Sequence, residues 1–289
     1  NYESPVTGYQ IAESIGPRLL KDAICVEIDN KFQDLSYEIS ESINIRIVTT
    51  KDLDALHILR HSSAHILAQA VLNLYPNAQF GVGPSIENGF YYDFLFETPI
   101  KENELENIEK EMKSIAKSAQ SFIRSEITKK DAVKIFRNQK LKLELIESAE
   151  SDEGVGEEIV STYANDEFID LCMGPHVPST SVLKHFKLTK VSGAYWRGDE
   201  SNVQLQRIYG TSWFSKEDLD QYLIQQEEAE KRDHRKLGNE LDLFTSSEEL
   251  GSGNFLWKPK GAVLRDVIET YSKKAHLQNG YSLVNTPHI

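Results

Sequence analysis

The chain has 289 residues, which is too long for one typical domain and suits two domains with part of a third. Hydrophobic residues make up 39% and charged residues 27% of the chain, and this ordinary globular composition excludes a disordered or fibrous protein. The formal net charge of −13 argues against binding to nucleic acid through general basicity.

Membrane-spanning and secretory segments are not expected from the sequence. It contains no apolar run long enough for a membrane helix, and its first residues form neither the basic nor the apolar part of a signal peptide. Only two cysteines occur, Cys25 and Cys172. A disulfide framework is therefore not expected, and we predict a reducing, cytoplasmic location without membrane contact.

Basic residues nevertheless gather in two segments. Lysines and arginines crowd residues 184–207 and 231–236, whereas residues 144–158 are acidic. A basic face can therefore coexist with an acidic chain, although solvated surface charge explains each basic cluster equally well.

Residues 1–50 predict a small α+β unit. The pattern indicates a helix at Gln10–Gly16 and two strands, Ala23–Ile28 and Ile43–Val48, with a turn at Asp29–Asn30. This order is typical of a β-grasp-like module, and we expect its first strands to be missing.

A long helix is predicted over Asp52–Tyr75, because apolar residues recur there at helical spacing and Pro76 ends the pattern. The helix carries His57, His61 and His65. His61 and His65 are four residues apart and so share one face. We interpret His57 as a solvated residue of the helix surface.

Two strands and two helices follow this long helix. The strands Ala78–Val82 and Gly89–Phe96 are expected to pair, since the residues between them have the composition of a turn. Helices are predicted around Glu102–Ser118 and Lys130–Asn138.

The next segment, Leu141–Ile146, alternates like a strand in which Lys142 and Glu144 share one face. The acidic residues 148–158 are expected to form a loop. A further strand, Phe168–Cys172, then delivers its last residue into a tight turn.

The last part of the chain is predicted to form a linker helix followed by an incomplete domain. Lys216–Lys236 predicts a long charged helix with few apolar positions, which suits a link between domains. A glycine-rich segment with Trp257, a helix at Val263–His276 and a strand at Tyr281–Pro287 follow. A final strand without neighbours would expose an unpaired edge, so we expect this unit to be incomplete.

Four separated side chains form a candidate metal site. His61 and His65 come from the long helix, and Cys172 and His176 from a loop that contains glycine and proline. Two imidazoles, a thiolate and a third imidazole can enclose zinc tetrahedrally. A site that uses all four ligands is closed and structural, whereas catalysis needs an open position.

The same cluster can also work without a metal. Histidine titrates near neutral pH and acts as a general acid or base, Lys142 can serve as a donor or base, and Asp170 can orient a ring. Spacing alone leaves the last two residues as surface charges of strands.

The sequence resembles the threonyl-tRNA synthetases of the bacterial or organellar type over nearly its whole length. The matching blocks, in that family's order, are Arg60-His-Ser-Ser-Ala-His65, Gly83-Pro-Ser-Ile-Glu-Asn-Gly-Phe-Tyr-Tyr-Asp93, Asp170-Leu-Cys-Met-Gly-Pro-His-Val-Pro178, His185-Phe-Lys-Leu188, Gly193-Ala-Tyr-Trp-Arg-Gly-Asp199, Leu205-Gln-Arg-Ile-Tyr-Gly-Thr211 and Lys231-Arg-Asp-His-Arg-Lys236.

The resemblance implies an α+β multidomain protein. Its parts would be a β-grasp TGS module at 1–50, an α+β editing domain of the alanyl/threonyl type at 51–214 and a linker helix at 215–240. The start of a class II antiparallel-sheet catalytic domain would follow at 241–289, with motif 1 and its Pro287. The ATP, magnesium and zinc of aminoacylation, and the homodimer of the class, would then belong to a part beyond this sequence, so that this fragment is competent only for editing.

The resemblance also implies the residues of an editing site. They are His61, His65, Tyr92, Lys142, Asp170, Cys172 and His176. In this family the site is thought to hydrolyse without a bound metal, so we assign no firm metal ligand. Zinc at His61, His65, Cys172 and His176 is the alternative.

The expected reaction is hydrolysis of mischarged seryl-tRNA(Thr). Serine differs from threonine only by the lack of one methyl group, so a pocket that binds threonine can reject serine by only about 10- to 200-fold. A second site must therefore add selectivity. We expect His61 or Lys142 to activate water, and His176 and Asp170 to hold the ammonium group and the ribose. Phosphate contacts are expected from Lys184, Lys187, Lys190, Arg197, Arg207, Arg232 and Arg235.

Two other functions remain open on the sequence. One is a stand-alone zinc-dependent aminoacyl-ester hydrolase, which would have no use for a linker helix and motif 1. The other is a non-catalytic TGS-type RNA-binding protein, which would not need the histidines and cysteine. No Gly-x-x-x-x-Gly-Lys phosphate loop occurs.

Overall fold

The computed structural model describes residues 5–148, 153–247, 251 and 254–286. Contacts between residues divide the chain into two units, Asn1–Asp220 and Gln221–Ile289. Both combine helices with antiparallel sheets, so the predicted α+β class is confirmed. In these described ranges, no helix has both the length and the hydropathy that a membrane span needs.

The first unit begins with a small N-terminal module, which we define as residues 5–50. Its elements are β1 (Val6–Thr7), α1 (Gly8–Ile15), α2 (Pro17–Asp22), β2 (Ala23–Ile28), β3 (Lys31–Asp34), β4 (Glu38–Ile39) and β5 (Ile45–Thr49). The order of its main sheet is β3-β2-β5, and β1 pairs with β4. The β2–β3 hairpin closes through Asp29 and Asn30, both in the left-handed region with φ of 48° and 63°. Asparagine and aspartate tolerate this conformation better than most residues, so the predicted turn is confirmed.

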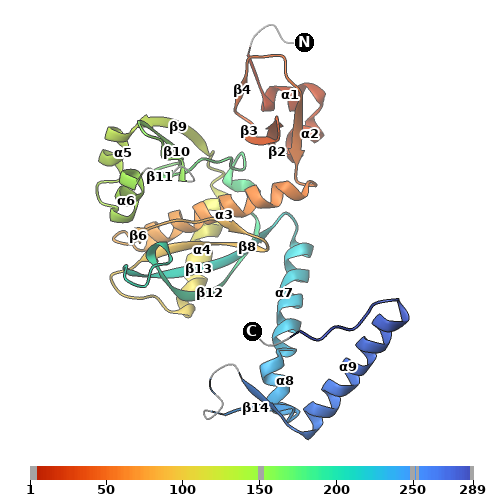
Figure 1. Ribbon diagram of the computed structural model, residues 1–289. Coiled ribbons are helices and arrows are strands. Elements are labelled where there is room, and N and C mark those ends of the chain that lie inside the picture. The colour runs from red at the N-terminus through yellow and green to blue at the C-terminus, as the bar shows by residue number, and fades with distance from the viewer. Residues whose placement is uncertain (1–4, 149–152, 248–250, 252–253, 287–289) are drawn as a thin grey trace. The chain divides into compact units, whose positions relative to one another are not determined.

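The centre of the first unit is the helix α3 (Leu53–Leu74), close to its predicted bounds. It lies beside a five-stranded antiparallel sheet, as Figure 1 shows, and packs on the strands β7, β8 and β13 of that sheet and on α4. The order of the sheet is β12-β13-β8-β6, with β7 also paired to β8. The bounds are β6 (Gln79–Phe80), β7 (Ser85–Ile86), β8 (Gly89–Leu95), β12 (His185–Tyr195) and β13 (Gln204–Trp213).

A second, three-stranded sheet has the order β11-β10-β9. Its strands are β9 (Ile123–Thr128), β10 (Ile159–Asn165) and β11 (Phe168–Leu171). Further helices among the described residues of the first unit are η1 (Glu102–Glu104), α4 (Leu105–Lys117), α5 (Lys129–Ile135), α6 (Lys140–Ser148), η3 (Thr180–Val182) and η4 (Trp196–Gly198). One hydrophobic core joins both sheets to α3 and includes Ile24, Cys25 and Val48 of the N-terminal module.

The segment Leu141–Ile146 is helical, so the predicted strand is wrong. An alternating pattern also places apolar residues four positions apart, which is helical spacing. Leu141 and Leu145 are such a pair, and both are buried. In a helix Lys142 and Glu144 point in different directions. Lys142 is buried, whereas the Glu144 carboxylate accepts from Trp196 Nε1 at 2.8 Å. The predicted loop at 148–158 lies partly outside the described residues.

The second unit contains α7 from its sixth residue onward, because α7 (Lys216–Lys231) begins in the first unit. The predicted single helix over Lys216–Lys236 is interrupted: Asp233 caps a new helix, α8 (His234–Glu240), by accepting from Arg235 N at 2.8 Å. Then follow β14 (Phe244–Ser246), β15 (Phe255–Trp257) and α9 (Pro259–Gln278). The predicted strand at Tyr281–Pro287 is wrong for residues 281–286, which have no regular structure, and Pro287 lies outside the described residues.

Candidate active site

Helix α3 places two of the predicted histidines beside each other. The middle of α3 is buried on nearly all sides, since it packs between a sheet and a helix. His65 is only 2% exposed, whereas His61, one turn earlier, is half-buried. Their ring centroids are 5.1 Å apart. His57 is exposed, as predicted, and its ring lies 3.1 Å from Ser85 Oγ.

The loop after β11 supplies the other half of the cluster. Cys172 follows the strand directly, and the Gly174–Pro175 peptide bond is cis. Gly174 has a φ of +75°, and a Cβ there would lie 1.9 Å from Tyr163 Oη. Only glycine fits at that position, and the loop returns His176 toward α3.

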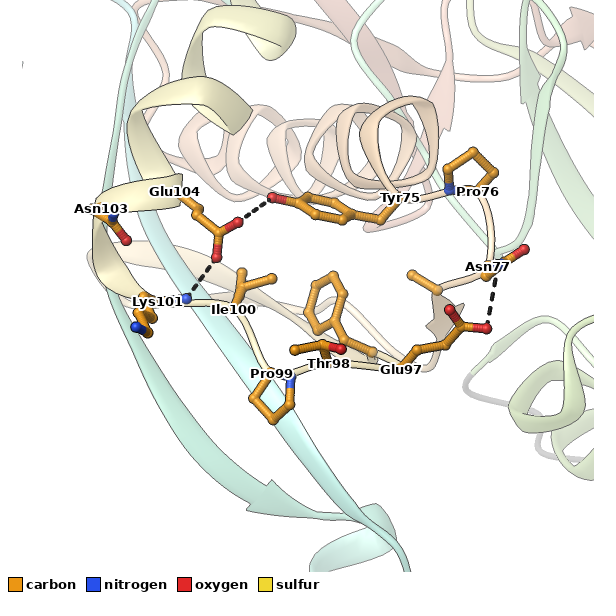
Figure 2. Close-up of a pocket in the computed structure, with 12 residues that line it drawn as sticks. Tyr75, Pro76, Asn77, Glu97, Thr98, Pro99, Ile100, Lys101, Asn103 and Glu104 are labelled. Atoms are coloured by element: carbon orange, nitrogen blue, oxygen red, sulfur yellow. Dashed lines mark hydrogen bonds between the residues drawn. The ribbon is translucent and has the colours of Figure 1, made fainter.

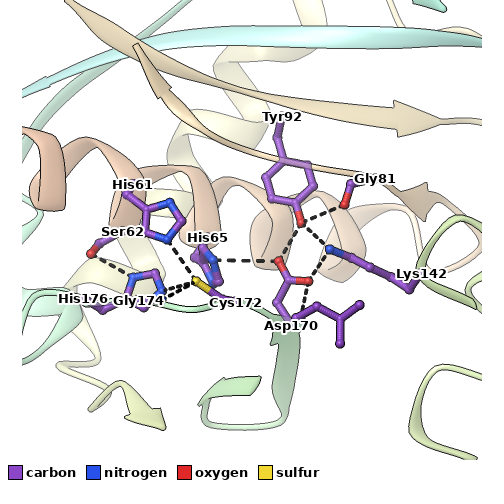
Figure 3. Close-up of polar contacts among 11 residues, drawn as sticks. His61, Ser62, His65, Gly81, Tyr92, Lys142, Asp170, Cys172, Gly174 and His176 are labelled. Atoms are coloured by element: carbon purple, nitrogen blue, oxygen red, sulfur yellow. Dashed lines mark hydrogen bonds and ion pairs between the residues drawn. The ribbon is translucent and has the colours of Figure 1, made fainter. Parts of the chain in front are cut away.

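The thiol of Cys172 lies at the centre of this histidine–cysteine cluster, which we define as His61, His65, Cys172 and His176 (Figure 3). Cys172 Sγ lies 3.0 Å from His61 Nε2 and 3.3 Å from His176 Nε2. The rings of His61 and His176 stack at 4.6 Å between centroids. One ligand atom from each of the four residues lies within 4.8 Å of the others.

A serine that the sequence reasoning missed fixes the orientation of His176. Ser62 Oγ donates to Ile58 O at 2.8 Å, so its only proton is already used. It therefore accepts from Val177 N at 3.0 Å and from His176 Nδ1, also at 3.0 Å. A neutral His176 consequently carries its proton on Nδ1, and its Nε2 lone pair faces the sulfur.

The other predicted residues form a separate buried group, the Lys142–Asp170–Tyr92 group. Lys142 Nζ pairs with Asp170 Oδ1 and donates to the Tyr92 hydroxyl at 3.1 Å. The Tyr92 hydroxyl in turn donates to Asp170 Oδ2 at 2.5 Å, and Leu171 N donates to Oδ1 at 2.8 Å. None of the three residues is more than 1% exposed. This ion pair is thus enclosed and well hydrogen-bonded (Figure 3).

The two groups meet at His65. Its Nε2 lies 3.9 Å from Asp170 Oδ2, and its buried Nδ1 has no hydrogen-bond partner among the described residues. A buried polar atom without a partner is costly in a folded protein. This nitrogen is therefore a candidate contact for a bound molecule.

Both groups border one pocket of about 680 Å³. The pocket is lined by His61, His65, Tyr92, Asp170 and Cys172, with residues of the N-terminal module on another side. Lys142 and His176 are not among its lining residues. The pocket is large enough for more than an amino acid, since drug-sized ligands occupy pockets of roughly 300–1,000 Å³.

A second hollow, of about 640 Å³, lies at the end of α3 between Tyr75–Ala78 and Phe96–Glu104 (Figure 2). Glu104 there already accepts from the Tyr75 hydroxyl at 3.0 Å and from Lys101 N at 2.8 Å. No predicted site residue lines it in the part of the chain that the structure describes.

Burial keeps the histidine–cysteine cluster uncharged. It lowers the pKa of His61 to about 4, with a contribution from His57. Burial also holds the pKa of His65 and that of His176 well below the usual value, and neighbouring histidines act in the same direction. The pKa of Cys172 is raised far above its usual value, again by burial first. At neutral pH the rings are therefore neutral and the thiol is protonated.

The basic residues predicted to contact tRNA are spread over both units. Lys187 Nζ lies 3.2 Å from Glu109 Oε2, Lys190 Nζ lies 4.6 Å from the centre of the Tyr209 ring, and Arg197 donates to Ser148 Oγ at 2.7 Å. Lys184 is exposed.

Arg207 is held by Asp93, to which it donates at 2.7 and 2.8 Å, and it stacks on Tyr91 at 3.8 Å. In the second unit Arg232 pairs with Glu228 at 3.2 Å and Arg235 with Asp233 at 2.8 Å. Their contact with RNA stays a prediction.

Residues 160–209, from β10 to β13, match a family model described as the second additional domain of threonyl and alanyl tRNA synthetases. This part of the chain is therefore a domain of the kind found in threonyl and alanyl tRNA synthetases.

Threonine–tRNA ligases are similar to nearly the whole chain. That of Burkholderia multivorans is 50% identical over 291 aligned positions, which cover 100% of this chain and 45% of the relative. That of Nitrosococcus oceani is 47% identical over 100% of this chain and 44% of the relative. That of Geobacter sp. (strain M21) is 46% identical over 97% and 44%. The chain belongs to the threonine–tRNA ligase family and spans less than half the length of these relatives.

Proposed function

We propose that this chain hydrolyses the ester bond of seryl-tRNA(Thr) in the pocket between α3 and the Cys172 loop. The observation that carries the proposal is His61, which is only partly buried, is neutral at physiological pH and lines a pocket of about 680 Å³. A neutral imidazole on a pocket wall can take a proton from water. Its pKa of about 4 makes it a weak base, so orientation of the water has to supply much of the rate.

The reaction begins with the 3′ end of the tRNA in the pocket. A water beside His61 loses a proton to the imidazole and attacks the ester carbonyl carbon, and the ribose hydroxyl leaves with a proton returned from the ring. Asp170 and His65 line the same pocket, and His65 Nδ1 has no hydrogen-bond partner among the described residues, so these two side chains can hold the seryl ammonium and hydroxyl groups. Serine and threonine differ by one methyl group, so exclusion of threonine has to come from the size of this space.

The structure favours His61 over Lys142 as the group that activates water. Lys142 is 0% exposed and is not among the residues that line the pocket. Its ammonium group is already bound to Asp170 and Tyr92. We propose that Lys142 fixes Asp170 and takes no part in proton transfer. His176, which is 1% exposed, would likewise hold Cys172 in place and not contact the ribose.

We also propose the wider organisation that the family implies. The N-terminal module would be a TGS domain, residues 51–214 the editing domain, residues 215–240 the linker helix and residues 241–289 the start of the class II catalytic domain. Synthesis of threonyl-tRNA(Thr) from threonine and ATP with magnesium and zinc, and formation of a homodimer, would belong to the whole enzyme. The basic residues of both units would contact tRNA phosphates.

A zinc-dependent hydrolase is the second candidate. Four ligand atoms lie within 4.8 Å of one another, the Nε2 lone pair of His176 faces the sulfur, and His65 Nδ1 has no partner in the described part of the chain. The donor set therefore fits zinc, which His61, His65, Cys172 and His176 would hold. All four ligands together would close the site, so a hydrolytic zinc would need one of the four positions left to water, whose pKa it would lower. The protonated thiol would first have to lose its proton.

The direct test compares deacylation of seryl-tRNA(Thr) and threonyl-tRNA(Thr) by this chain. We expect hydrolysis of the seryl ester and at least about tenfold slower hydrolysis of the threonyl ester, the minimum that one methyl group permits. Equal rates for both esters, or no hydrolysis of either, would refute the proposal. Salt should raise KM, because phosphate contacts release counterions.

A further inference from the structure

Strand β3 of the N-terminal module contacts the Cys172–His176 loop directly. Asp34, the last residue of β3, accepts two hydrogen bonds from residues on the far side of this contact. His176 N donates to Asp34 Oδ1 at 2.9 Å, and the Tyr163 hydroxyl donates to Asp34 Oδ2 at 2.6 Å. The carboxylate is partly buried. It therefore joins two parts of the chain that are 142 and 129 residues away in sequence.

The two donors to Asp34 are parts of the loop's own support. Tyr163 packs edge-on against the His176 ring, with 4.5 Å between centroids, and its hydroxyl occupies the space next to Gly174. The His176 ring in turn faces Cys172. Among the described residues, the sulfur of Cys172 is the hydrogen-bond partner of His176 Nε2. A shift of His176 N or Tyr163 would consequently move Cys172, which contacts His61.

The same strand also forms part of the pocket. Lys31, Phe32 and Gln33 precede Asp34 in β3, and all three line the pocket that contains His61. The module is held in this place by apolar packing as well, because Ile24, Cys25 and Val48 belong to the core that includes α3. The pocket would thus be open on one side without the N-terminal module.

We propose that Asp34 is a positioning residue for the hydrolytic site: the N-terminal module completes the pocket and fixes the Cys172–His176 loop through this carboxylate. The inference rests on the proposed ester hydrolysis. It gives the module a role in the chemistry of the pocket besides any role in binding RNA. Asp34 touches no reacting atom and acts through His176 N and Tyr163.

The test uses the full chain, with Asp34→Ala as the main variant. Loss of hydrogen bonds to a charged acceptor should lower kcat for seryl-tRNA deacylation by about 10- to 100-fold. KM should change by less than about threefold, since substrate contacts remain. Asp34→Asn should stay within about threefold of the parent, because its amide oxygen can still accept from His176 N. Glu38→Ala removes an exposed carboxylate of the same module and is the matched control.

A second readout separates positioning from unfolding and from activity. The chain has two cysteines, Cys172 in the loop and Cys25 of the module, which is buried in the core that includes α3. In Asp34→Ala we expect alkylation of Cys172 by iodoacetamide, followed by mass spectrometry, to become at least about tenfold faster, since the loop opens. Cys25, which is 0% exposed, should stay unreactive. In Glu38→Ala neither cysteine should change.

The kinetic and alkylation results together test the positioning role of Asp34. Parent-like kcat together with parent-like alkylation of Cys172 in Asp34→Ala overturns the proposal. If both cysteines of Asp34→Ala react, the module has unfolded and Tyr163→Phe decides: faster alkylation of Cys172 alone supports the proposal, and no change overturns it. If the parent chain hydrolyses no ester, the proposed function fails, while the alkylation of Cys172 still tests the positioning role.

Discussion

The two groups beside the pocket differ in charge: the histidine–cysteine cluster is neutral, and the Lys142–Asp170–Tyr92 group contains a buried ion pair. The histidine–cysteine cluster avoids charge, because burial lowers the pKa of its imidazoles and raises the pKa of its thiol. The Lys142–Asp170–Tyr92 group keeps a full ion pair away from solvent and satisfies it with hydrogen bonds from Tyr92 and Leu171. The cluster presents the partly exposed imidazole of His61 to the pocket.

This difference suggests a division of labour. A neutral imidazole can exchange a proton with water at neutral pH, whereas a buried and paired ammonium group cannot do so without breaking the pair. The charged group is better suited to hold Asp170 in one orientation. Mutations should therefore affect rate in the cluster and stability in the charged group.

The largest effect is expected for His61→Ala. Removal of a general base typically costs about 10²- to 10⁴-fold in rate, so kcat for seryl-tRNA deacylation should fall by that amount. The control is His276→Ala, an exposed histidine of α9 in the second unit. A rate within about threefold of the parent would show that His61 is not the base.

Lys142→Ala should have the largest effect on stability. It leaves the Asp170 carboxylate buried without its ammonium partner, which costs about 3–5 kcal/mol of unfolding free energy. The control is Lys140→Ala, an exposed lysine of the same helix, with an expected change within about 0.5 kcal/mol. Urea unfolding measures both. If the two variants were equally stable, the buried ion pair would have no structural importance.

Much of the fold could be predicted from the sequence, because long elements carry repeated signals. The apolar spacing of α3 and the turn residues Asp29 and Asn30 are local features, and both predictions are confirmed. The α6 segment was misjudged because its alternating leucines fit a strand and a helix equally well. Only packing selects the helix, which turns Lys142 inward to Asp170.

The site was predictable to the extent that its residues lie in recognisable motifs. Ser62 lies within one of those motifs, so its sequence position was a usable signal for a role beside His61. Asp34 and Tyr163 carry no such signal, because their hydrogen bonds join residues more than a hundred positions apart. Such pairs follow from topology, which a single sequence does not specify.

Acid should destabilise the folded chain through the histidines of the cluster. His61, His65 and His176 have lowered pKa values in the folded state, so the unfolded chain binds more protons below about pH 6.5. Stability should fall as the pH drops from about 6.5 toward 4, by up to about 1.4 kcal/mol per pH unit for each histidine.

Urea midpoints at pH 7, 6 and 5 measure this slope. In His65→Leu the slope should be smaller by the share of one histidine. Equal slopes in His65→Leu and the parent would mean that His65 titrates normally when folded.

The smallest effect is expected from metal removal. If the cluster works as a base site, a chelator should change the deacylation rate by less than about twofold, since no step requires a coordinated water. Elemental analysis of the purified chain should find well under one zinc per chain. Near-stoichiometric zinc, lost together with activity on chelation, would favour the zinc-dependent hydrolase.

The most direct test of the neutral-imidazole account is the pH dependence of kcat for seryl-tRNA deacylation between pH 5.5 and 8. With a His61 pKa of about 4, more than about 95% of the imidazole is neutral at pH 5.5, so the rate should be nearly flat. A base with the ordinary pKa of about 6.5 would lose about tenfold in rate over this interval. A flat profile is the predicted result, and a tenfold fall centred near pH 6.5 would contradict the account.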